Sequence, residues 1–331
     1  MFVRGVFSLQ EKTDQLIESF KSGNVRALAR IISVIENEGE NRDEILKNIF
    51  NLSGRAYILG VTGSPGAGKS SLVDRITSQL RKRSETVGIV AVDPTSPFTG
   101  GALLGDRIRM QDHAVDRGVY IRSMGTRGSL GGLARTTKDV VKALDAFGYQ
   151  WVIVETVGVG QAELDIMNVA DTTMVVLTPG AGDSIQTIKA GIMEIADIFA
   201  VNKCDLPGAP RVASEVMQML DLQGGAVEWR PPVVQVSTLD DRGLGDLLEA
   251  IEKHRSHLTK GGLLENERED RARRETLEIV DYLWKKLVGF QLSHEGYVNE
   301  MLDRVTGRKA DPYSAAEDII RYIIANSGLK G

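Results

Sequence analysis

The chain has 331 residues, of which 42% are hydrophobic and 26% are charged, and its formal net charge at pH 7 is −5. A chain of this length can form one large domain with extensions or two domains, and its slightly acidic balance gives no reason to expect nucleic acid or an anionic membrane as a partner. No apolar run approaches the roughly 18 residues of a membrane span, and no charged and then apolar leader follows Met1, so we expect a soluble, cytoplasmic protein.

Residues 1–55 are predicted to form a helical extension in front of the first strand. Asn24 suits the N-cap of a helix. Two apolar stripes with helical spacing follow, Leu28, Ile31, Ile32 and Ile35 in the first and Ile45, Leu46, Ile49 and Phe50 in the second. Because such stripes pack against neighbouring elements, we expect the extension to cover part of the domain that follows.

From residue 56 to residue 256, short apolar runs alternate with helical patterns. The runs predict seven strands, at residues 57–62, 87–93, 119–122, 151–155, 172–178, 198–202 and 233–237. This alternation is typical of an α/β domain with a mostly parallel sheet flanked by helices. Ligands of such sheets bind at the carboxyl ends of the strands, and each polar motif described next follows one of these ends.

The first run leads into a complete G-x-x-x-x-G-K-[ST] motif, which precedes an amphipathic helix. A strand, a glycine loop and a helix are the context in which this motif binds phosphate, and a ligand-free glycine turn is the alternative. Backbone N–H groups and the helix N-terminus face the phosphates, Lys69 reaches the outer phosphates, and the Ser70 hydroxyl binds magnesium. The predicted phosphate-binding residues are Gly63, Ser64, Pro65, Gly66, Ala67, Gly68, Lys69, Ser70 and Ser71.

The second run ends at Asp93, which is followed by a loop rich in proline, glycine and hydroxyl residues. A carboxylate at a strand end beside a phosphate loop can hold magnesium through water, and a loop of this composition can close over the terminal phosphate. We therefore interpret Asp93 as a candidate metal residue. The alternative is an ordinary crossover in which Asp93 caps the start of the loop.

The fourth run ends at Glu155, and Gly158 follows soon after it. A carboxylate at this strand end anchors magnesium directly or through water, and the glycine frees a backbone N–H near the terminal phosphate. Val159 stands where a Ras-like GTPase has the glutamine that orients the attacking water, and Gln161 is out of register. We therefore expect slow hydrolysis by the isolated chain, with a partner or a moving loop completing the site.

The fifth run ends in Thr178-Pro179-Gly180-Ala181-Gly182-Asp183, a composition typical of a hinge. Asp183 can cap the helix that follows, or it can belong to a further switch loop. The two roles are compatible, and the sequence leaves both open.

The sixth run ends in Asn202-Lys203-Cys204-Asp205, an N-K-x-D motif. One carboxylate can accept both the N1–H and the exocyclic amine of guanine, whereas adenine has an acceptor in place of N1–H, so Asp205 selects GTP over ATP. Lys203 lays its stem along the base, and Asn202 ties neighbouring loops together. After the seventh run, backbone N–H groups suit the carbonyl oxygen of guanine. The predicted guanine-binding residues are Asn202, Lys203, Asp205, Ser237, Thr238 and Leu239.

Residues 257–331 form a predicted helical arm. A stretch dense in alternating charge leads into Leu277, Val280, Trp284 and Leu287 at helical spacing, and two further helices are predicted at about 296–305 and 312–325. A long helix cannot easily bury such a half-apolar face by itself. We therefore expect dimerisation or partner docking through this arm, with packing on its own domain as the alternative.

Together these motifs closely resemble the MeaB/ArgK family of G-protein chaperones, which is related to the human methylmalonic aciduria type A protein. The most specific pieces are Asp93 to Gly101 and Glu155 to Gln161, and the similarity covers nearly the whole chain. The resemblance implies a P-loop NTPase fold of the SIMIBI type and a homodimer built through the C-terminal arm. It also implies an adenosylcobalamin-dependent acyl-CoA mutase as partner, whose cofactor loading, protection or reactivation depends on GTP.

The resemblance also assigns roles to individual residues. It implies that Lys69, Glu155, Asp183 and Lys189 are catalytic, with Asp183 and Lys189 in a third switch loop that senses the mutase. It places Ser70, Asp93, Asp106 and Glu155 around a magnesium ion. Mg²⁺ with GTP or GDP is the expected ligand, and we expect no cobalamin on this chain itself.

Two other functions stay open at this point. A nickel or zinc insertion GTPase also has a glutamate at the position of Glu155 and also forms dimers. However, Cys204 and four histidines are a poor set of ligands for delivering such metals. His254 and His257 lack a cysteine or an acidic pair beside them in sequence, so we expect both at the solvated surface. The other function, a transport-linked ATPase or kinase for lysine, arginine and ornithine, is disfavoured by Asp205.

Overall fold

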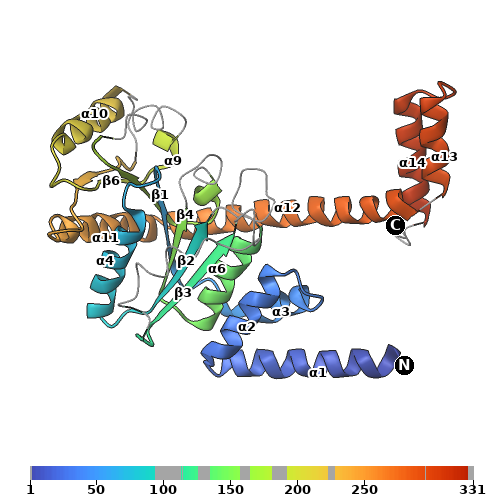
Figure 1. Cartoon of the computed structure of the whole chain (residues 1–331), viewed down its shortest axis with the longest axis horizontal. Helices are drawn as coiled ribbons and strands as arrows, with labels where there is room; N and C mark the ends of the chain where they lie inside the picture. The colour runs from blue at the N-terminus through green and yellow to red at the C-terminus, as the bar shows by residue number, and fades with distance from the viewer. Residues whose placement is uncertain are drawn as a thin grey trace. The chain divides into compact units, whose positions relative to one another are not determined.

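The computed structural model describes residues 2–93, 113, 115–125, 135–156, 165–180, 192–222, 228–294 and 296–326 (Figure 1). The chain forms two compact units, Met1–Leu264 and Glu265–Gly331. The first unit contains both the predicted N-terminal extension and the predicted nucleotide-binding domain. The finer division at residues 56 and 257 stays a prediction.

A seven-stranded sheet is the centre of the first unit. Its strands are β1 Tyr57–Thr62, β2 Val87–Asp93, β3 Val119–Gly125, β4 Trp151–Thr156, β5 Thr172–Leu177, β6 Ile198–Val201 and β7 Val233–Gln235. They are paired in parallel in the order β3-β2-β4-β1-β5-β6-β7. The predicted α/β class and P-loop NTPase fold are confirmed, and all seven predicted strands are present with ends that differ by at most a few residues. Continuous apolar runs identified these strands because both faces of a parallel sheet are buried.

Helices cover both faces of this sheet (Figure 1). One face packs against α4 Lys69–Lys82 and α11 Leu244–Lys260, and the other packs against α6 Arg135–Phe147 and, near β5 and β6, α10 Ala209–Leu222. The short elements η3 Ile166–Asn168 and α9 Met193–Ile195 complete the described helices of the sheet domain. Gly60 lets η3 approach β1 closely, because a Cβ atom at this position would lie 2.7 Å from a side-chain carbon of Ile166.

The N-terminal extension is helical, as predicted. It consists of α1 Phe2–Lys21, α2 Val25–Glu36, α3 Arg42–Ile49 and the short helix η1 Phe50–Leu52. Asn24 is the N-cap of α2, and its side chain accepts hydrogen bonds from the N–H groups of Arg26 and Ala27. The two predicted stripes pack on the α6 face of the sheet, which confirms the expected covering role. Phe50 is the exception, because η1 turns its side chain outward and leaves it 62% exposed.

Among the described residues, three ion pairs join this extension to the sheet domain, and one of them joins Arg135 of α6 to Glu38 at 3.4 Å. The buried Arg42 guanidinium contacts the Asp139 carboxylate of α6, and Arg122 of β3 contacts Glu36 of α2. Glu36 raises the pKa of Arg122 through this contact. Because a buried charge without a partner is costly, the Arg42–Asp139 pair fixes how α3 lies on α6.

The second unit contains the remainder of α12 Leu263–His294, together with α13 Gly296–Thr306 and α14 Pro312–Asn326. These match the predicted helices of the arm. A small core of Val298, Met301, Ala315, Ile319 and Ile323 holds α13 against α14. Leu277, Val280 and Trp284 of α12 are 69%, 56% and 41% exposed.

Across the described residues, every helix is too short or too polar to cross a membrane.

His254 is buried, so its predicted place at the solvated surface is wrong. It shares the inner face of α11 with Leu247, Ile251 and Leu258, and its Nδ1 lies 2.8 Å from Oγ1 of Thr172. Burial, followed by the nearby His257, lowers the pKa of His254 from about 6.5 to about 4. The helical spacing of these four residues was the signal in the sequence that marks His254 as a core residue.

Candidate nucleotide site

The glycine loop lies between the carboxyl end of β1 and the start of α4, and two of its glycines have no possible replacement. Gly63 has a φ of +137°, and a Cβ atom there would lie 2.1 Å from the carbonyl oxygen of Val176. Gly68 has a φ of +87°, and its Cβ would lie 2.4 Å from Nδ2 of Asn202. Both positions need a residue that adopts a left-handed backbone conformation and has no side chain. This need explains why the motif has glycine at positions 63 and 68.

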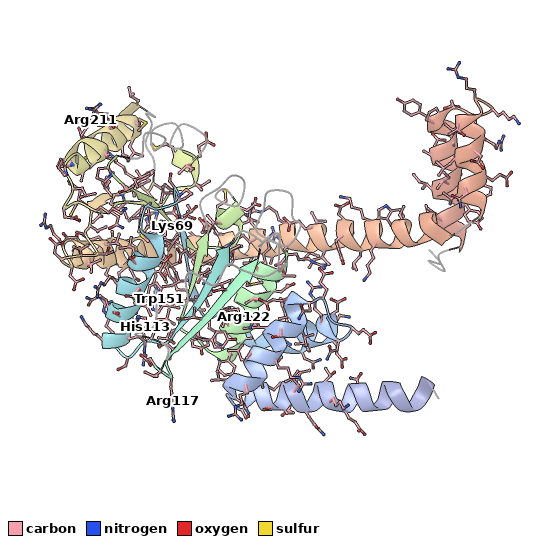
Figure 2. All side chains as sticks on the ribbon, viewed as in Figure 1. Lys69, His113, Arg117, Arg122, Trp151 and Arg211 are labelled. Carbon is pink, nitrogen blue, oxygen red and sulfur yellow. The ribbon has the colours of Figure 1, made fainter. Side chains whose placement is uncertain are left out.

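Lys69 begins α4, where Figure 2 labels it, and its side chain reaches back to the loop. Its Nζ donates to the carbonyl oxygens of Gly63 at 2.6 Å and Ser64 at 3.1 Å, and the side chain is buried. The N-cap of α4, Gly68, has no side chain to bond the first N–H groups of the helix. A buried ammonium beside a helix N-terminus is a site for an anion such as phosphate.

Ser70 and Glu155 lie in direct contact, so the structure brings together two of the four predicted metal residues. Ser70 Oγ donates to Oε1 of Glu155 at 2.6 Å, and both side chains are buried. The contact follows from sheet order, because β1 and β4 are neighbours and Val61 pairs with Glu155. A hydroxyl and a carboxylate are hard oxygen donors that fit Mg²⁺. These two residues would hold the ion, which would neutralise phosphate charge when bound.

Other predicted residues of the phosphate side cannot be placed. Asp93 ends β2 beside β4, but its side chain is not among those described. Asp106, Asp183 and Lys189 lie outside the described residues, as do Gly158, Val159 and Gln161. Their predicted roles stay predictions. Within the described ranges, no group of three or more histidine, cysteine, aspartate or glutamate side chains could hold a metal ion.

The N-K-x-D motif connects the loops around the nucleotide site. Asn202 Nδ2 donates to the carbonyl oxygen of Ala67 at 2.8 Å, and Lys203 Nζ donates to that of Gly66 at 2.8 Å. Asp205 Oδ1 accepts from the Ser237 hydroxyl at 2.8 Å. The glycine loop, the N-K-x-D loop and the loop after β7 are therefore held together by side chains, and Asn202 ties neighbouring loops as the sequence predicted.

Arg75 is a residue of this region that the sequence analysis missed. From α4, its Nε lies 3.3 Å from the carbonyl oxygen of Thr238, one of the predicted guanine-binding residues. No local motif marks this arginine, since its partner is far away in the chain. The one signal in the sequence is indirect. It is the helical spacing between Lys69 and Arg75, which could place Arg75 on the side of α4 that faces the loop after β7.

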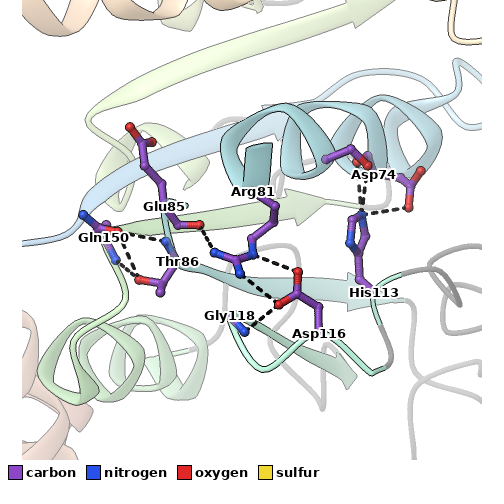
Figure 3. Close-up of polar contacts among 9 residues, drawn as sticks. Asp74, Arg81, Glu85, Thr86, His113, Asp116, Gly118 and Gln150 are labelled. Carbon is purple, nitrogen blue, oxygen red and sulfur yellow. Dashed lines mark hydrogen bonds and ion pairs between the residues drawn. The ribbon is translucent and has the colours of Figure 1, made fainter. Parts of the chain in front are cut away.

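The chain just after residue 112 is fixed to the opposite end of α4 (Figure 3). His113 Nε2 lies 3.3 Å from the Ser78 hydroxyl and 3.4 Å from an Asp74 carboxylate oxygen. Asp116 forms two hydrogen bonds with Arg81, at 2.8 and 3.0 Å, and Arg81 is the main cause of its lowered pKa. The helix that begins with Lys69 and Ser70 therefore also holds His113 and Asp116, which precede β3 in the chain.

A hollow of about 860 Å³ lies beside these contacts, at the amino ends of β2 and β3. Its lining includes Thr86, Arg117, Tyr120, Phe147 and Tyr149. The glycine loop lies at the carboxyl end of the sheet, so this hollow is separate from the nucleotide site. The convergence of side chains on the glycine loop, and not this hollow, marks the candidate functional site.

Comparisons with known proteins agree with this site. The family model described as "Methylmalonyl Co-A mutase-associated GTPase MeaB" matches residues 28–289. A putative GTPase of Pyrococcus abyssi is 49% identical over 314 residues, covering 94% of this chain and 97% of the relative. The GTPase ArgK of Escherichia coli is 34% identical and covers 87% of each chain. The mitochondrial methylmalonic aciduria type A homolog of Caenorhabditis elegans is 32% identical, covering 78% of this chain and 70% of the relative.

A solved structure of an LAO/AO transport system kinase has a TM-score of 0.70 with 24% identity, covering 95% of this chain and 98% of that chain. At this identity the likeness supports the fold alone. The family model, by contrast, spans most of the chain, and its residues include the glycine loop, Glu155 and the N-K-x-D motif. The chain therefore belongs to the MeaB family of GTPases.

Proposed function

We propose that this GTPase is a chaperone that gates cofactor loading of an adenosylcobalamin-dependent acyl-CoA mutase and protects or reactivates that enzyme. The observation that carries the proposal is the match of residues 28–289 to the family described as associated with methylmalonyl-CoA mutase. The name of the Caenorhabditis elegans relative points in the same direction. The nucleotide site supplies the switch that such a role needs.

In this proposal the chain's own residues bind and orient GTP. Lys69 holds the outer phosphates, Ser70 and Glu155 hold the magnesium that neutralises them, and Asp205 selects guanine. Because Val159 cannot orient an attacking water by hydrogen bonding, intrinsic hydrolysis is slow. Asp183 and Lys189 form the third switch, through which the mutase completes the site and accelerates turnover.

We also propose that the chain is a homodimer joined through residues 257–331. Leu277, Val280 and Trp284 recur at helical spacing on α12 and are 41 to 69% exposed. An apolar face of this kind on a long charged helix suits burial against a second copy. Sedimentation of the full chain tests this point, since a monomer at micromolar concentration would contradict it.

The experiment that tests the chaperone role measures GTP hydrolysis with and without purified cobalamin-dependent mutases. We expect one mutase to be retained by the immobilised chain and to stimulate hydrolysis. Lys189→Ala should keep nucleotide affinity but lose the stimulation, whereas Lys82→Ala, at an exposed position on α4, should keep both.

The outcomes separate the parts of the proposal. If no cobalamin-dependent mutase binds or stimulates, the chaperone role is wrong. If Lys189→Ala is stimulated like the parent chain, the third switch is misassigned. The family assignment does not favour the metal-insertion and transport-kinase alternatives, and tight stoichiometric nickel or zinc, or ATP binding as strong as GTP binding, would restore them.

A further inference from the structure

The segment between β7 and α11 forms a tight turn beside Asp205. Gly243 has a φ of +70°, and a Cβ atom there would lie 2.1 Å from the carbonyl oxygen of Gln235, so glycine is required. Asp241 also has a positive φ, +57°. Inside the turn, the Ser237 N–H donates to the carbonyl oxygen of Arg242 at 3.0 Å. Asp241 is the residue of this turn for which a left-handed backbone is costly, so contacts that hold Asp241 help to stabilise the turn.

Arg75 of α4 supplies contacts of this kind. Its Nε lies 3.3 Å from the Thr238 carbonyl oxygen and 3.3 Å from Oδ1 of Asp241. One guanidinium thus touches both sides of the turn. Because Lys69 begins the same helix, α4 carries both the phosphate-binding lysine and the residue that holds the loop on the base side.

A directed chain of hydrogen bonds leads from Arg75 to Asp205. The Thr238 carbonyl and the Leu239 N–H belong to one trans peptide plane, so holding the first orients the second. The Leu239 nitrogen lies 3.3 Å from Ser237 Oγ, and Ser237 Oγ donates to Oδ1 of Asp205 at 2.8 Å. Every donor in this chain points toward Asp205, and hydrogen bonds arranged in one direction strengthen one another.

Asp240 is the other carboxylate of this turn. The Ser237 hydroxyl is the main cause of the lowered pKa of this exposed carboxyl. Arg242 gives Asp240 a donor of its own at 2.8 Å, whereas the Ser237 hydroxyl donates to Asp205 at 2.8 Å. The turn that Arg75 contacts therefore carries the donor that holds Asp205.

We propose that Arg75 is a positioning residue for nucleobase selection, which acts through the Thr238–Leu239 peptide and Ser237 to orient the Asp205 carboxylate toward guanine. The inference rests on the guanine-binding role of Asp205 given above and is independent of the partner enzyme. Arg75 does not touch the base. Its loss should therefore weaken recognition of the base edge and leave the phosphate contacts of Lys69 unchanged.

The test measures equilibrium affinities of the full chain for GDP, for inosine diphosphate, which lacks the exocyclic amine, and for ADP. Arg75→Met keeps the aliphatic stem and removes the donor. We expect GDP affinity to fall about threefold to tenfold, the range that one net hydrogen bond contributes, and inosine diphosphate affinity to fall less. Arg83→Met is the matched control, because Arg83 directly follows α4 and contacts Glu252 instead of the turn. It should leave the ratio of the two affinities unchanged.

Several outcomes would overturn the proposal. Equal losses for GDP and inosine diphosphate would mean that Arg75 acts through the fold alone, and unchanged affinities would mean that it has no role. Ser237→Ala should lower the same ratio, and adding Arg75→Met should lower it little further; full additivity would show that the two residues do not act in one chain. A parent chain that binds ADP as tightly as GDP would instead contradict the guanine assignment itself.

Discussion

The two ends of the sheet use similar polar residues for different purposes. At the carboxyl ends, Lys69, Glu155 and Asp205 contact neighbouring residues of the nucleotide site, namely Gly63, Ser70 and Ser237 respectively. At the amino ends, Asp145 accepts hydrogen bonds from the backbone N–H groups of residues 54–56, and Asp171 accepts one from Ile58 N at 2.9 Å. The second set anchors the starts of strands, and we propose that the first set binds the nucleotide and its metal ion.

This difference shows that the place of a carboxylate in a βα unit matters more than its residue type. An aspartate just before a strand meets the first N–H groups of neighbouring strands, which have no ladder partner and need an acceptor. A carboxylate just after a strand meets the loops and the helix N-termini that attract ligands. Changes at the carboxyl edge should therefore alter binding, whereas changes at the amino edge should alter the free energy of unfolding.

The largest effect is expected for Lys69→Ala. The change removes the buried ammonium that reaches the outer phosphates, and charge-assisted hydrogen bonds to phosphate contribute strongly. We expect GTP and GDP binding to weaken by about 1,000-fold, equivalent to about 4 kcal/mol, which titration calorimetry would report as abolished binding. The urea midpoint should change little.

If the GDP affinity of Lys69→Ala stayed within tenfold of the parent's, the proposed difference between the two edges would be wrong. The carboxyl edge would then not be where the nucleotide binds. Lys82→Ala is the control for a lost positive charge on α4. Lys82 is exposed, so this variant should bind normally.

Asp145→Ala should have the next largest effect, on stability. The carboxylate accepts from the N–H groups of Gly54, Arg55 and Ala56, which lead the chain from the extension into β1. At about 1 kcal/mol for each net hydrogen bond, its loss should lower the free energy of unfolding by roughly 3 kcal/mol. Urea denaturation measures this loss, and GDP affinity of the folded chain should stay the same.

Two companion variants sharpen the Asp145 prediction. Asp145→Asn keeps one carbonyl oxygen as acceptor and should lose less stability than the alanine variant. Asp14→Ala, at an exposed position on α1, should lose almost none. If Asp145→Ala instead weakened GDP binding while leaving the urea midpoint unchanged, the division of roles between the two edges would be wrong.

Much of the carboxyl edge could be predicted from the sequence, because its chemistry depends on residues that lie close together in the chain. The glycine loop, Glu155 and the N-K-x-D motif each follow a recognisable apolar strand. Parallel strands direct all such ends to one edge, so separate motifs converge without any knowledge of strand order. The direct contact between Ser70 and Glu155 needs more, because it depends on β1 and β4 being neighbours in the sheet.

The amino edge and the helix contacts could not be predicted in the same way. The Arg42–Asp139 pair and the contact of Arg75 with Thr238 depend on which helix lies over which strand. Nothing near these residues in sequence marks their partners. The neighbours of His254 in sequence predict a solvated histidine, whereas its burial follows from the face of α11 on which it lies.

The smallest of the expected effects is a pH dependence that arises at the amino edge. In the folded chain His254 takes up a proton only below a pKa of about 4, whereas in the unfolded chain it does so below about 6.5. The unfolded state thus binds more protons between these values, and stability is lost as the pH falls through this window. The loss from this residue between pH 7 and pH 5 should be about 2 kcal/mol.

Urea denaturation of the parent chain and of His254→Gln at both pH values tests this prediction. The glutamine variant should lose less stability on acidification, since a neutral amide has no proton to take up. His257→Gln, which lies on the same helix and is only partly buried, should reduce the pH dependence less than His254→Gln, because His257 is the smaller cause of the lowered His254 pKa. An unaltered pH dependence in His254→Gln would show that the acid sensitivity comes from elsewhere. The contact of His254 with Thr172 would then stabilise the fold as the contacts of Asp145 do. Protonation of His254 would not change the free energy of unfolding.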